Sequence, residues 1–176
     1  MSTALRHRNL PQLMLQAREA LMAQFRPILN ENGVTEQQWR IIRALLARGP
    51  LEPRQLCELC QISSPSIVGV LLRLEEAGLV DRERMADDQR RVRVSVTARG
   101  RQLGRRMIPA IEERYASIAK QVGVKTLQQA YDVLDALRPQ VGSILISANR
   151  NRDRYSAYGC PVVADRLENH PGPLAG

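Results

Sequence analysis

The sequence predicts a mainly α-helical fold with one small β-hairpin. Apolar residues recur at steps of three and four over most of the chain, the period of helices with one buried face. One short stretch after Gly78 changes to alternation with a period of two, which is typical of paired strands. At about 150 residues per domain, a chain of 176 residues allows one domain or two small units that share a core.

The chain is basic, and its positive charge is almost all arginine. Lysine and arginine total 26 against 18 acidic residues, a net charge of +8. Only Lys120 and Lys125 are lysines, so we expect an anionic partner. Aromatic residues make up 3% of the chain, which argues against a single-strand binder that stacks bases and favours double-stranded DNA.

Composition also bears on where the protein resides. No run approaches the roughly 18 apolar residues that a membrane span needs, and the N-terminus lacks the apolar core of a signal peptide. Three cysteines, an odd number, fit a reducing compartment. We therefore expect a cytoplasmic protein without a membrane partner.

Turn and cap residues divide the first half into helices. A helix is expected over residues 11–32, bent at Pro27 and ended by Asn32-Gly33. The next begins at a capping box, Thr35-Glu36-Gln37-Gln38, in which the Thr35 and Gln38 side chains each satisfy an orphan N–H, and it ends at Gly49-Pro50.

Two short helices then predict a helix-turn-helix. Pro53 is placed to open the first, and the run Ser63-Ser64-Pro65-Ser66 opens the second. The second helix has Ile67, Leu71 and Leu74 on its core face and ends at Gly78. Two short helices with about three or four residues between them are typical of this motif.

A hairpin and two long helices complete the chain. Val92, Val94 and Val96 alternate with polar residues, and residues 79–84 can pair with them across a polar tip, residues 85–90. Thr97 then caps a helix expected to run to about residue 121, kinked at Pro109. A second capping-box pattern, Thr126-Leu127-Gln128-Gln129, is expected to open the last helix.

The last helix has more apolar surface than one small lobe can cover. Its stripe, together with those of the first and fifth helices, predicts a homodimer with interleaved terminal helices. The expected organisation is an N-terminal arm and dimerisation helix (1–34), a winged helix-turn-helix lobe (35–97), C-terminal dimerisation helices (98–150) and a flexible tail (151–176).

Candidate DNA contacts lie on the second helix of the motif and on the hairpin. The helix is expected to expose small and polar side chains and one arginine, which suit a major groove: Ser63, Ser66, Gly69, Val70 and Arg73. Between Arg82 and Arg106 nine arginines accompany three acidic residues, and the hairpin tip suits a narrow minor groove. The alternatives are a solvated helix face and a charged edge hairpin that resists aggregation. The predicted DNA-binding residues are Ser63, Ser64, Ser66, Arg73, Asp88, Arg90 and Arg91.

In this order the motifs resemble the MarR family of winged helix-turn-helix regulators, from about residue 10 to residue 150. The residues that carry the resemblance are Leu74-Glu75-x-x-Gly78-Leu79-Val80, Asp88-x-Arg90 and Val94-x-Val96-Thr97-x-x-Gly100. Three segments are similar to the regulators of homoprotocatechuate (hydroxyphenylacetate) degradation within that family: Gln16-Ala17-Arg18-Glu19-Ala20, Phe25-Arg26-Pro27 and Thr35-Glu36-Gln37-Gln38-Trp39-Arg40-Ile41.

The resemblance implies a dimeric repressor on a pseudo-palindromic operator, released by a small aromatic or heteroaromatic acid such as a hydroxyphenylacetate, a hydroxybenzoate or a nicotinate derivative. It implies Arg18 as a partner for the carboxylate and Trp39 as an apolar wall, with Arg43 and His7 as further ligand contacts. The simpler interpretations are a core role for Trp39 and surface ion pairs for the arginines.

Other functions have less support in the sequence. Cys57 and Cys60 could form a thiol-based redox sensor, but their spacing on one helix favours packing thiols, and the four ligands of a zinc site are lacking. We expect no metal and no cofactor. Nucleotide-binding and hydrolase motifs are absent, so we expect no enzyme. A winged-helix module that binds protein remains the third hypothesis.

Overall fold

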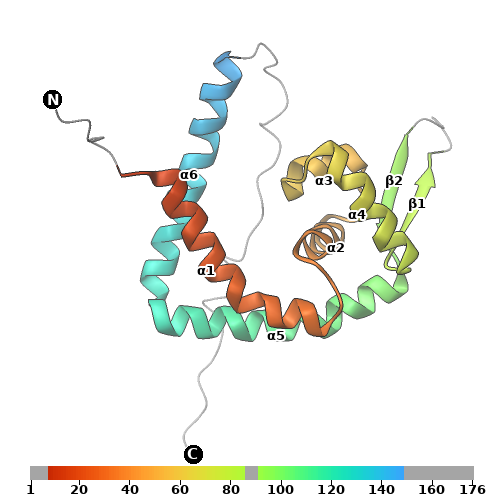
Figure 1. Cartoon of the computed structure of the whole chain (residues 1–176), viewed down its shortest axis with the longest axis horizontal. Helices are drawn as coiled ribbons and strands as arrows, with labels where there is room; N and C mark the ends of the chain where they lie inside the picture. Colours follow the sequence, from red (N-terminus) through yellow and green to blue (C-terminus); the bar gives the residue numbers. More distant parts are fainter. Residues whose placement is uncertain (1–7, 86–90, 149–176) are drawn as a thin grey trace, which may run out of the picture. The chain divides into compact units, whose positions relative to one another are not determined.

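The computed structural model describes residues 8–85 and 91–148, and it describes only the backbone of 138–148. The chain divides into two compact units, Met1–Gln121 and Val122–Gly176. The elements follow in the predicted order (Figure 1): α1 (Leu10–Glu31), α2 (Glu36–Arg48), α3 (Pro53–Cys60), α4 (Ser64–Glu76), β1 (Val80–Arg84), β2 (Val92–Val96), α5 (Ala98–Val122) and α6 (Val124–Ala148). The mainly helical class with one hairpin is confirmed. His7, Asp88, Arg90 and the expected flexible tail lie outside the described residues.

The predicted caps set the helix starts in the first unit. At α2, Gln38 N donates to Thr35 Oγ1 at 3.2 Å, and Thr35 N donates to Gln38 Oε1 at 2.8 Å. At α5, Gly100 N donates to Thr97 Oγ1 at 3.0 Å, and that hydroxyl donates to the carbonyl of Gly78 at 2.8 Å. Thr97 therefore ties the start of α5 to the turn between α4 and β1.

The core of the first unit draws on all five of its helices and the hairpin. Its most buried large side chains are Ile41, Ile42, Leu45, Leu56, Leu74 and Met107. Two glycines let α5 pack closely on its neighbours. A Cβ at Gly100 would lie 2.2 Å from the carbonyl oxygen of Leu79, and one at Gly104 would lie 2.5 Å from Leu46 Cδ1. These glycines fix α5 against the base of the hairpin and against α2.

The hairpin is antiparallel and anchored at its base. Its register pairs Val80 with Val96 and Arg84 with Val92. Outside the two strands, Leu51 N donates to the Val94 carbonyl at 3.0 Å and Val94 N donates to the Leu51 carbonyl at 2.8 Å. The segment between α2 and α3 thus acts as a one-residue third strand, which fixes the hairpin to the helix-turn-helix.

Two helix starts differ from prediction. α6 begins at Val124, before the capping-box pattern at Thr126, because Gly123 takes φ +95° and its carbonyl accepts the N–H of Leu127 at 3.0 Å. α1 begins at Leu10, where Asn9 Oδ1 accepts from Gln12 N at 3.1 Å. This asparagine cap was not predicted from the sequence.

Candidate nucleic-acid interface and effector site

The second and third elements of the lobe form a helix-turn-helix. α3 and α4 are bent at 108° to one another, within the range of about 90–120° for this motif. The turn contains no glycine, and Gln61 takes the left-handed conformation, with φ 50° and ψ 50°. Its side-chain amide donates to the Glu58 carbonyl at 2.7 Å, at the end of α3. α2, α3 and α4 lie together beside the hairpin (Figure 1).

The outer face of α4 exposes most of the predicted DNA-binding side chains. Ser63, Ser64, Ser66 and Arg73 are exposed. The prediction for Val70 is wrong, because its side chain is 1% exposed and joins Ile67, Leu71 and Leu74 in the core. The apolar stripe of α4 is wider than predicted by this one residue.

Two apolar side chains that were not among the predicted DNA contacts lie on the exposed part of α4. Val68 is 61% exposed and Leu72 is 46% exposed. Their positions beside the core stripe at Ile67 and Leu71 were the available signal, since a branched apolar residue outside the stripe of a surface helix has no core to fill. On a DNA-binding helix, such side chains can contact thymine methyl groups.

The polar groups of α4 are already partly ordered. Ser63 Oγ donates to Ser66 Oγ at 2.8 Å, so the two hydroxyls bond to one another instead of capping the helix. Arg73 has no acidic partner within 4 Å among the described residues. Its guanidinium lies over Gly69, where an added Cβ would lie 3.5 Å from Arg73 Nη1. α4 thus presents an unpaired cation over a small residue.

The arginines of the hairpin are of two kinds. Arg82 forms an ion pair with Glu75, and this hydrogen bond holds the pKa of Glu75 below its ordinary value. Arg91 forms an ion pair with Glu52 at the start of α3. Arg84 and Arg93 are exposed at the surface, with Arg93 opposite Glu83 across the hairpin. Of the predicted wing contacts the structure describes only Arg91.

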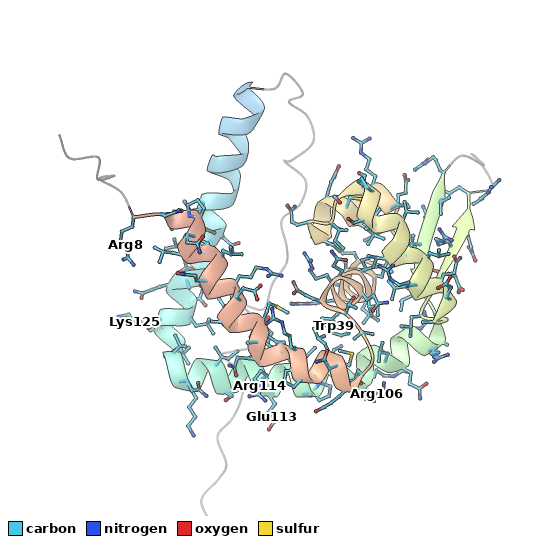
Figure 2. The ribbon with its side chains drawn as sticks, viewed as in Figure 1. Arg8, Trp39, Arg106, Glu113, Arg114 and Lys125 are labelled. Atoms are coloured by element: carbon cyan, nitrogen blue, oxygen red, sulfur yellow. The ribbon has the colours of Figure 1, made fainter. Side chains whose placement is uncertain are left out.

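The predicted effector residues on α1 and α2 differ in charge environment. Arg18 on α1 already binds the carboxylates of Glu19 and Glu36. Trp39 on α2 (Figure 2) is half-buried and packs against the core. Arg43, one helical turn further, is exposed and has no acidic partner within 4 Å in the described part of the chain. Of Arg18 and Arg43, the two predicted effector arginines, only Arg43 therefore has a guanidinium without an acidic partner among the described residues.

Arg40, which was not among the predicted effector residues, links this region to the helix-turn-helix. Its Nη2 lies 3.7 Å from the Glu36 carboxylate that also binds Arg18. Its Nη1 donates to the carbonyl of Cys60 at 2.6 Å. Because Cys60 is the last residue of α3, a continuous polar path runs from α1 through α2 to the end of α3.

An aromatic pair lies within the same unit. The rings of Phe25 on α1 and Tyr115 on α5 have centroids 4.8 Å apart and are tilted by 48°. Among the partly buried residues that pack against the core, Met22, Trp39 and Tyr115 have the largest side chains. They supply the apolar surface that an aromatic ligand would need.

The two cysteines of the C-x-x-C pattern are free thiols. Cys60 is buried, and burial raises the pKa of its thiol to about 11, an effect that Arg40 only partly opposes. A thiol with a raised pKa is largely protonated at neutral pH and is a poor nucleophile. These environments favour packing roles and disfavour the redox alternative.

Among residues 8–85 and 91–148, no three His, Cys, Asp or Glu side chains are grouped to hold a metal ion. In the same part of the chain, no single helix is long and apolar enough to cross a membrane; α3 and α4 meet that criterion only when the bent pair is taken together.

These features define a winged-helix DNA-binding protein: an exposed helix with serines and an unpaired arginine, next to an arginine-rich hairpin on the same core. Residues 32–91 match the MarR family. The HTH-type transcriptional regulator FarR of Neisseria gonorrhoeae is 42% identical over 137 residues, which cover 78% of this chain and 94% of FarR. The chain belongs to the MarR family. It is a DNA-binding transcriptional regulator and not an enzyme, as the sequence predicted.

Two further relatives bear on function. The homoprotocatechuate degradative operon repressor of Escherichia coli is 40% identical over 129 residues, covering 73% of this chain and 87% of that protein. The crystal structure of NadR in complex with 4-hydroxyphenylacetate has a TM-score of 0.68 and 43% identity, covering 78% of this chain and 97% of NadR.

A short segment matches a different class of protein. It is 54% identical over 44 residues to the molybdenum cofactor guanylyltransferase of Vibrio vulnificus, covering 25% of this chain and 22% of that enzyme.

Proposed function

We propose that the chain is a dimeric repressor that binds a pseudo-palindromic DNA operator and is released from it by a small aromatic or heteroaromatic carboxylic acid. The observation that carries the proposal is the exposed face of α4, with Ser63, Ser66 and unpaired Arg73, fixed to the same core as the arginine-rich hairpin. The repressor role is supported by the E. coli relative, and the effector class by the NadR complex with 4-hydroxyphenylacetate.

In this proposal α4 enters the major groove and the hairpin reaches the adjacent minor groove. Ser63, Ser64, Ser66 and Arg73 bind phosphates or base edges. Asp88, Arg90 and Arg91 act at the minor groove, where a narrow A·T-rich groove attracts guanidinium groups. Glu52, which binds Arg91, holds that guanidinium in place before DNA arrives.

Exposed apolar side chains support dimerisation. On α1 they are Leu10, Met14, Leu15 and Leu21, and on α6 they are Val124, Tyr131, Val133 and Leu134. Exposed apolar clusters of this kind mark interaction surfaces in soluble proteins. A second copy covers them, in line with the terminal helices predicted for dimerisation. Sedimentation at micromolar concentration tests this, and a monomer would contradict it.

The effector acts at Trp39 and Arg43, with Arg18 as the point of competition. An aromatic ring packs on Trp39, and its carboxylate binds the free guanidinium of Arg43. A carboxylate that also engages Arg18 displaces Glu36, which then pairs with Arg40 alone. Since Arg40 donates to the carbonyl at the end of α3, this exchange of partners carries the signal toward the recognition helix. His7 is a further ligand contact in the proposal.

A gel-shift series with a promoter fragment tests the DNA-binding part. Because phosphate contacts dominate such complexes, affinity falls steeply with salt, by on the order of a thousandfold between 50 and 200 mM for six or more phosphate contacts. Arg90→Ala weakens binding at flanking A·T-rich positions, and Ser66→Ala acts at the major-groove half-sites. Salt-insensitive binding, or equal losses on all sequences for both variants, would refute the proposal.

Adding 4-hydroxyphenylacetate, hydroxybenzoates and pyridine carboxylates to the same assay tests the effector part. An effector also raises the melting temperature, because it binds the native state selectively. Trp39→Ala retains operator binding and loses the response to the acid. Arg40→Met still binds the effector, but the effector no longer releases this variant from the operator. Arg54→Ala, which removes an exposed arginine of α3, changes neither effector binding nor release from the operator. Release that survives in Arg40→Met would exclude the proposed path.

A further inference from the structure

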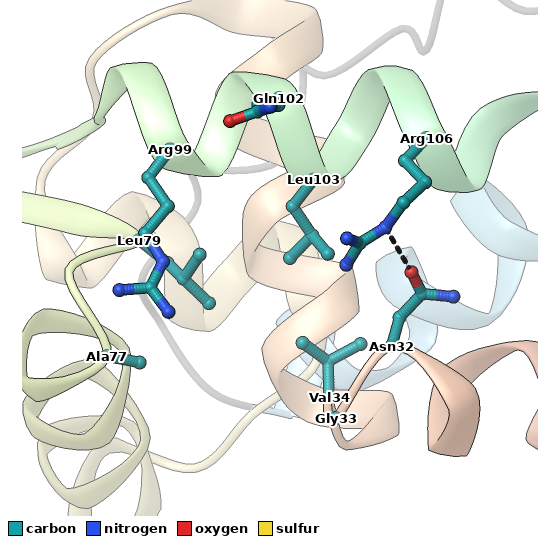
Figure 3. A pocket seen from close by; sticks show the side chains of 9 residues that line it. All are labelled: Asn32, Gly33, Val34, Ala77, Leu79, Arg99, Gln102, Leu103 and Arg106. Carbon is teal, nitrogen blue, oxygen red and sulfur yellow. Dashed lines mark hydrogen bonds between the residues drawn. The ribbon is translucent and has the colours of Figure 1, made fainter.

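A separate hollow lies on the first unit and shares no residue with the proposed effector site or with the exposed face of α4. Its volume is about 400 Å³, within the range of about 300–1,000 Å³ for small-molecule sites. Three segments line it: the turn between α1 and α2, the turn between α4 and β1, and the first turns of α5 (Figure 3).

The hollow has an apolar floor and a cationic rim. Val34, Leu79 and Leu103 contribute buried apolar side chains to it. Arg99 and Arg106 stand seven residues apart on α5, two turns along the same face. No acidic residue is among the residues that line it. Two guanidiniums over an apolar floor suit an anion with a hydrocarbon body.

One of the two cations is held in position. Arg106 Nε donates to Asn32 Oδ1 at 2.8 Å, as Figure 3 shows. The same Asn32 side chain donates to the carbonyl of Ile28 at 2.8 Å, so it is fixed from both sides. The Nη groups of Arg106 have no acidic partner within 4 Å among the described residues. They are available to an anion.

The local fold does not need these arginines to satisfy its helix ends. At the end of α1, Gly33 N donates to Asn30 and Val34 N donates to Leu29. At the end of α4, Gly78 N donates to Glu75 and Leu79 N donates to Leu74. Both pairs close the last turns in the Schellman manner. Arg99 and Arg106 are therefore free of a capping role, and within the described residues neither has an acid to pair with.

We propose that this hollow binds a small organic dianion, a dicarboxylate with a short hydrocarbon body. Each carboxylate binds one guanidinium, and the body lies on Val34, Leu79 and Leu103. Seven residues of helix separate the two Cα atoms by about 10 Å, which favours a chain of about six carbons over a compact diacid. The bound ligand links α5 to the end of the recognition helix, since the turn after α4 forms one wall.

Isothermal titration of the full chain with sodium malonate, glutarate, adipate and suberate, at constant ionic strength, tests this site. Adipate or suberate should bind at least fivefold more tightly than malonate and than the monoanion hexanoate. Arg99→Ala and Arg106→Ala should each weaken adipate binding at least tenfold. Arg105→Ala is the matched control, because it removes the same charge from the next position of α5 and does not line the hollow; its affinity should stay within twofold.

The assignment would be overturned if hexanoate bound as tightly as adipate, or if Arg105→Ala and Arg106→Ala weakened adipate binding equally. Trp39→Ala separates this hollow from the proposed effector site. Adipate binding unchanged by Trp39→Ala supports the hollow, and adipate binding lost in that variant would transfer the ligand to the effector site. Circular dichroism confirms that the exposed-arginine variants are folded.

A segment of about a quarter of the chain has relatives of a different class from the rest. The match to FarR covers 94% of FarR and leaves about a fifth of this chain uncovered. The matches to molybdenum cofactor guanylyltransferases span 43–51 residues, or 24–27% of this chain, at 51–55% identity. Since the MarR match occupies residues 32–91, no segment of that length fits before it. The 85 residues after that match are long enough to contain it.

We infer that the chain joins a MarR-type regulator to a C-terminal segment of guanylyltransferase lineage, and that the part of the chain beyond α6, residues 149–176, takes no part in operator binding. The division of the chain at Gln121–Val122 supports the separation, because the helix-turn-helix and hairpin belong entirely to the first unit. The segment matches 22–25% of those enzymes, so the inference includes no enzyme activity.

Deletion of residues 149–176 tests this inference in the same gel-shift assay. The deleted chain retains the whole of α6, and its operator affinity and sedimentation should match those of the full chain within twofold. A tenfold loss of operator affinity in a folded, dimeric deletion variant would overturn the inference. Arg73→Ala in the full chain provides the reference for a real loss of DNA binding.

Discussion

A single methyl group at Gly100 should strongly destabilise the first unit. Gly100→Ala places a Cβ 2.2 Å from the carbonyl oxygen of Leu79 and 2.6 Å from Val96 Cγ2. Overpacking of this kind costs about 1–3 kcal/mol. The same Leu79 carbonyl accepts the N–H of Thr97 at 3.1 Å, so moving it loses about 1 kcal/mol more. The gain from alanine in a helix, about 0.5–1 kcal/mol, does not offset this.

The net expectation is a loss of about 2 kcal/mol in the free energy of unfolding, or a melting temperature lower by roughly 4–8 °C. Chemical denaturation followed by circular dichroism measures the first, and calorimetry the second. Gly104→Ala should cost less, about 1 kcal/mol, because its obstacle is the movable end of Leu46. Gly69→Ala, where the added Cβ meets only Arg73 Nη1 at 3.5 Å, should be neutral or stabilising. A Gly100→Ala protein as stable as the parent, or an order of effects different from this one, would refute the reasoning.

Three further outcomes are expected. The Cys60 thiol, with a pKa of about 11 in the folded chain, should react with iodoacetamide at pH 8 far more slowly than a free cysteine, and fast labelling of the native protein would contradict this. Because the pKa is raised in the folded chain, the contribution of this thiol to stability is present below about pH 9 and should be lost as the pH rises toward 11. Val68→Ser should weaken operator binding by about 1 kcal/mol, and the loss should vanish on an operator in which uracil replaces the contacted thymine; an equal loss on both operators would exclude a methyl contact. Arg40→Met should lower stability by about 1.5–3 kcal/mol through loss of its bond to the Cys60 carbonyl, as measured by urea unfolding, whereas an unchanged midpoint would show that this bond adds nothing.

Local chemistry made the helix order and most helix starts predictable. Thr35 and Gln38 form the box that their spacing predicted, and Thr97 caps α5 as expected. Such caps depend on side chains within one turn, so the sequence alone defines them. The start of α6 was not predicted, because Gly123 could serve as linker or as the first carbonyl of a helix, and only the backbone angle decides.

Features that depend on contacts between distant segments could not be predicted. Val70 could lie on either side of the α4 stripe, and its burial follows from what packs against it. One of the two partners of Arg18 is Glu36, a residue 18 positions away on another helix. Arg106 and Asn32 are 74 positions apart, and their bond defines one wall of the hollow. The spacing of residues along the chain does not indicate such pairs. The exposed serines at the start of α4 could be predicted, because the helical period alone shows which positions face away from the core.

The one-residue bridge between Leu51 and Val94 has a consequence for operator design and for engineering. Two backbone hydrogen bonds tie the base of the hairpin to the segment before α3, so the hairpin cannot swing independently of the recognition helix. The span between the bases read in one groove and those read in its neighbour is thereby set by the protein. An operator with one extra base pair inside a half-site should be rejected even when every contacted base is kept. A hairpin transplanted from another regulator would need the residue at position 51 to come with it.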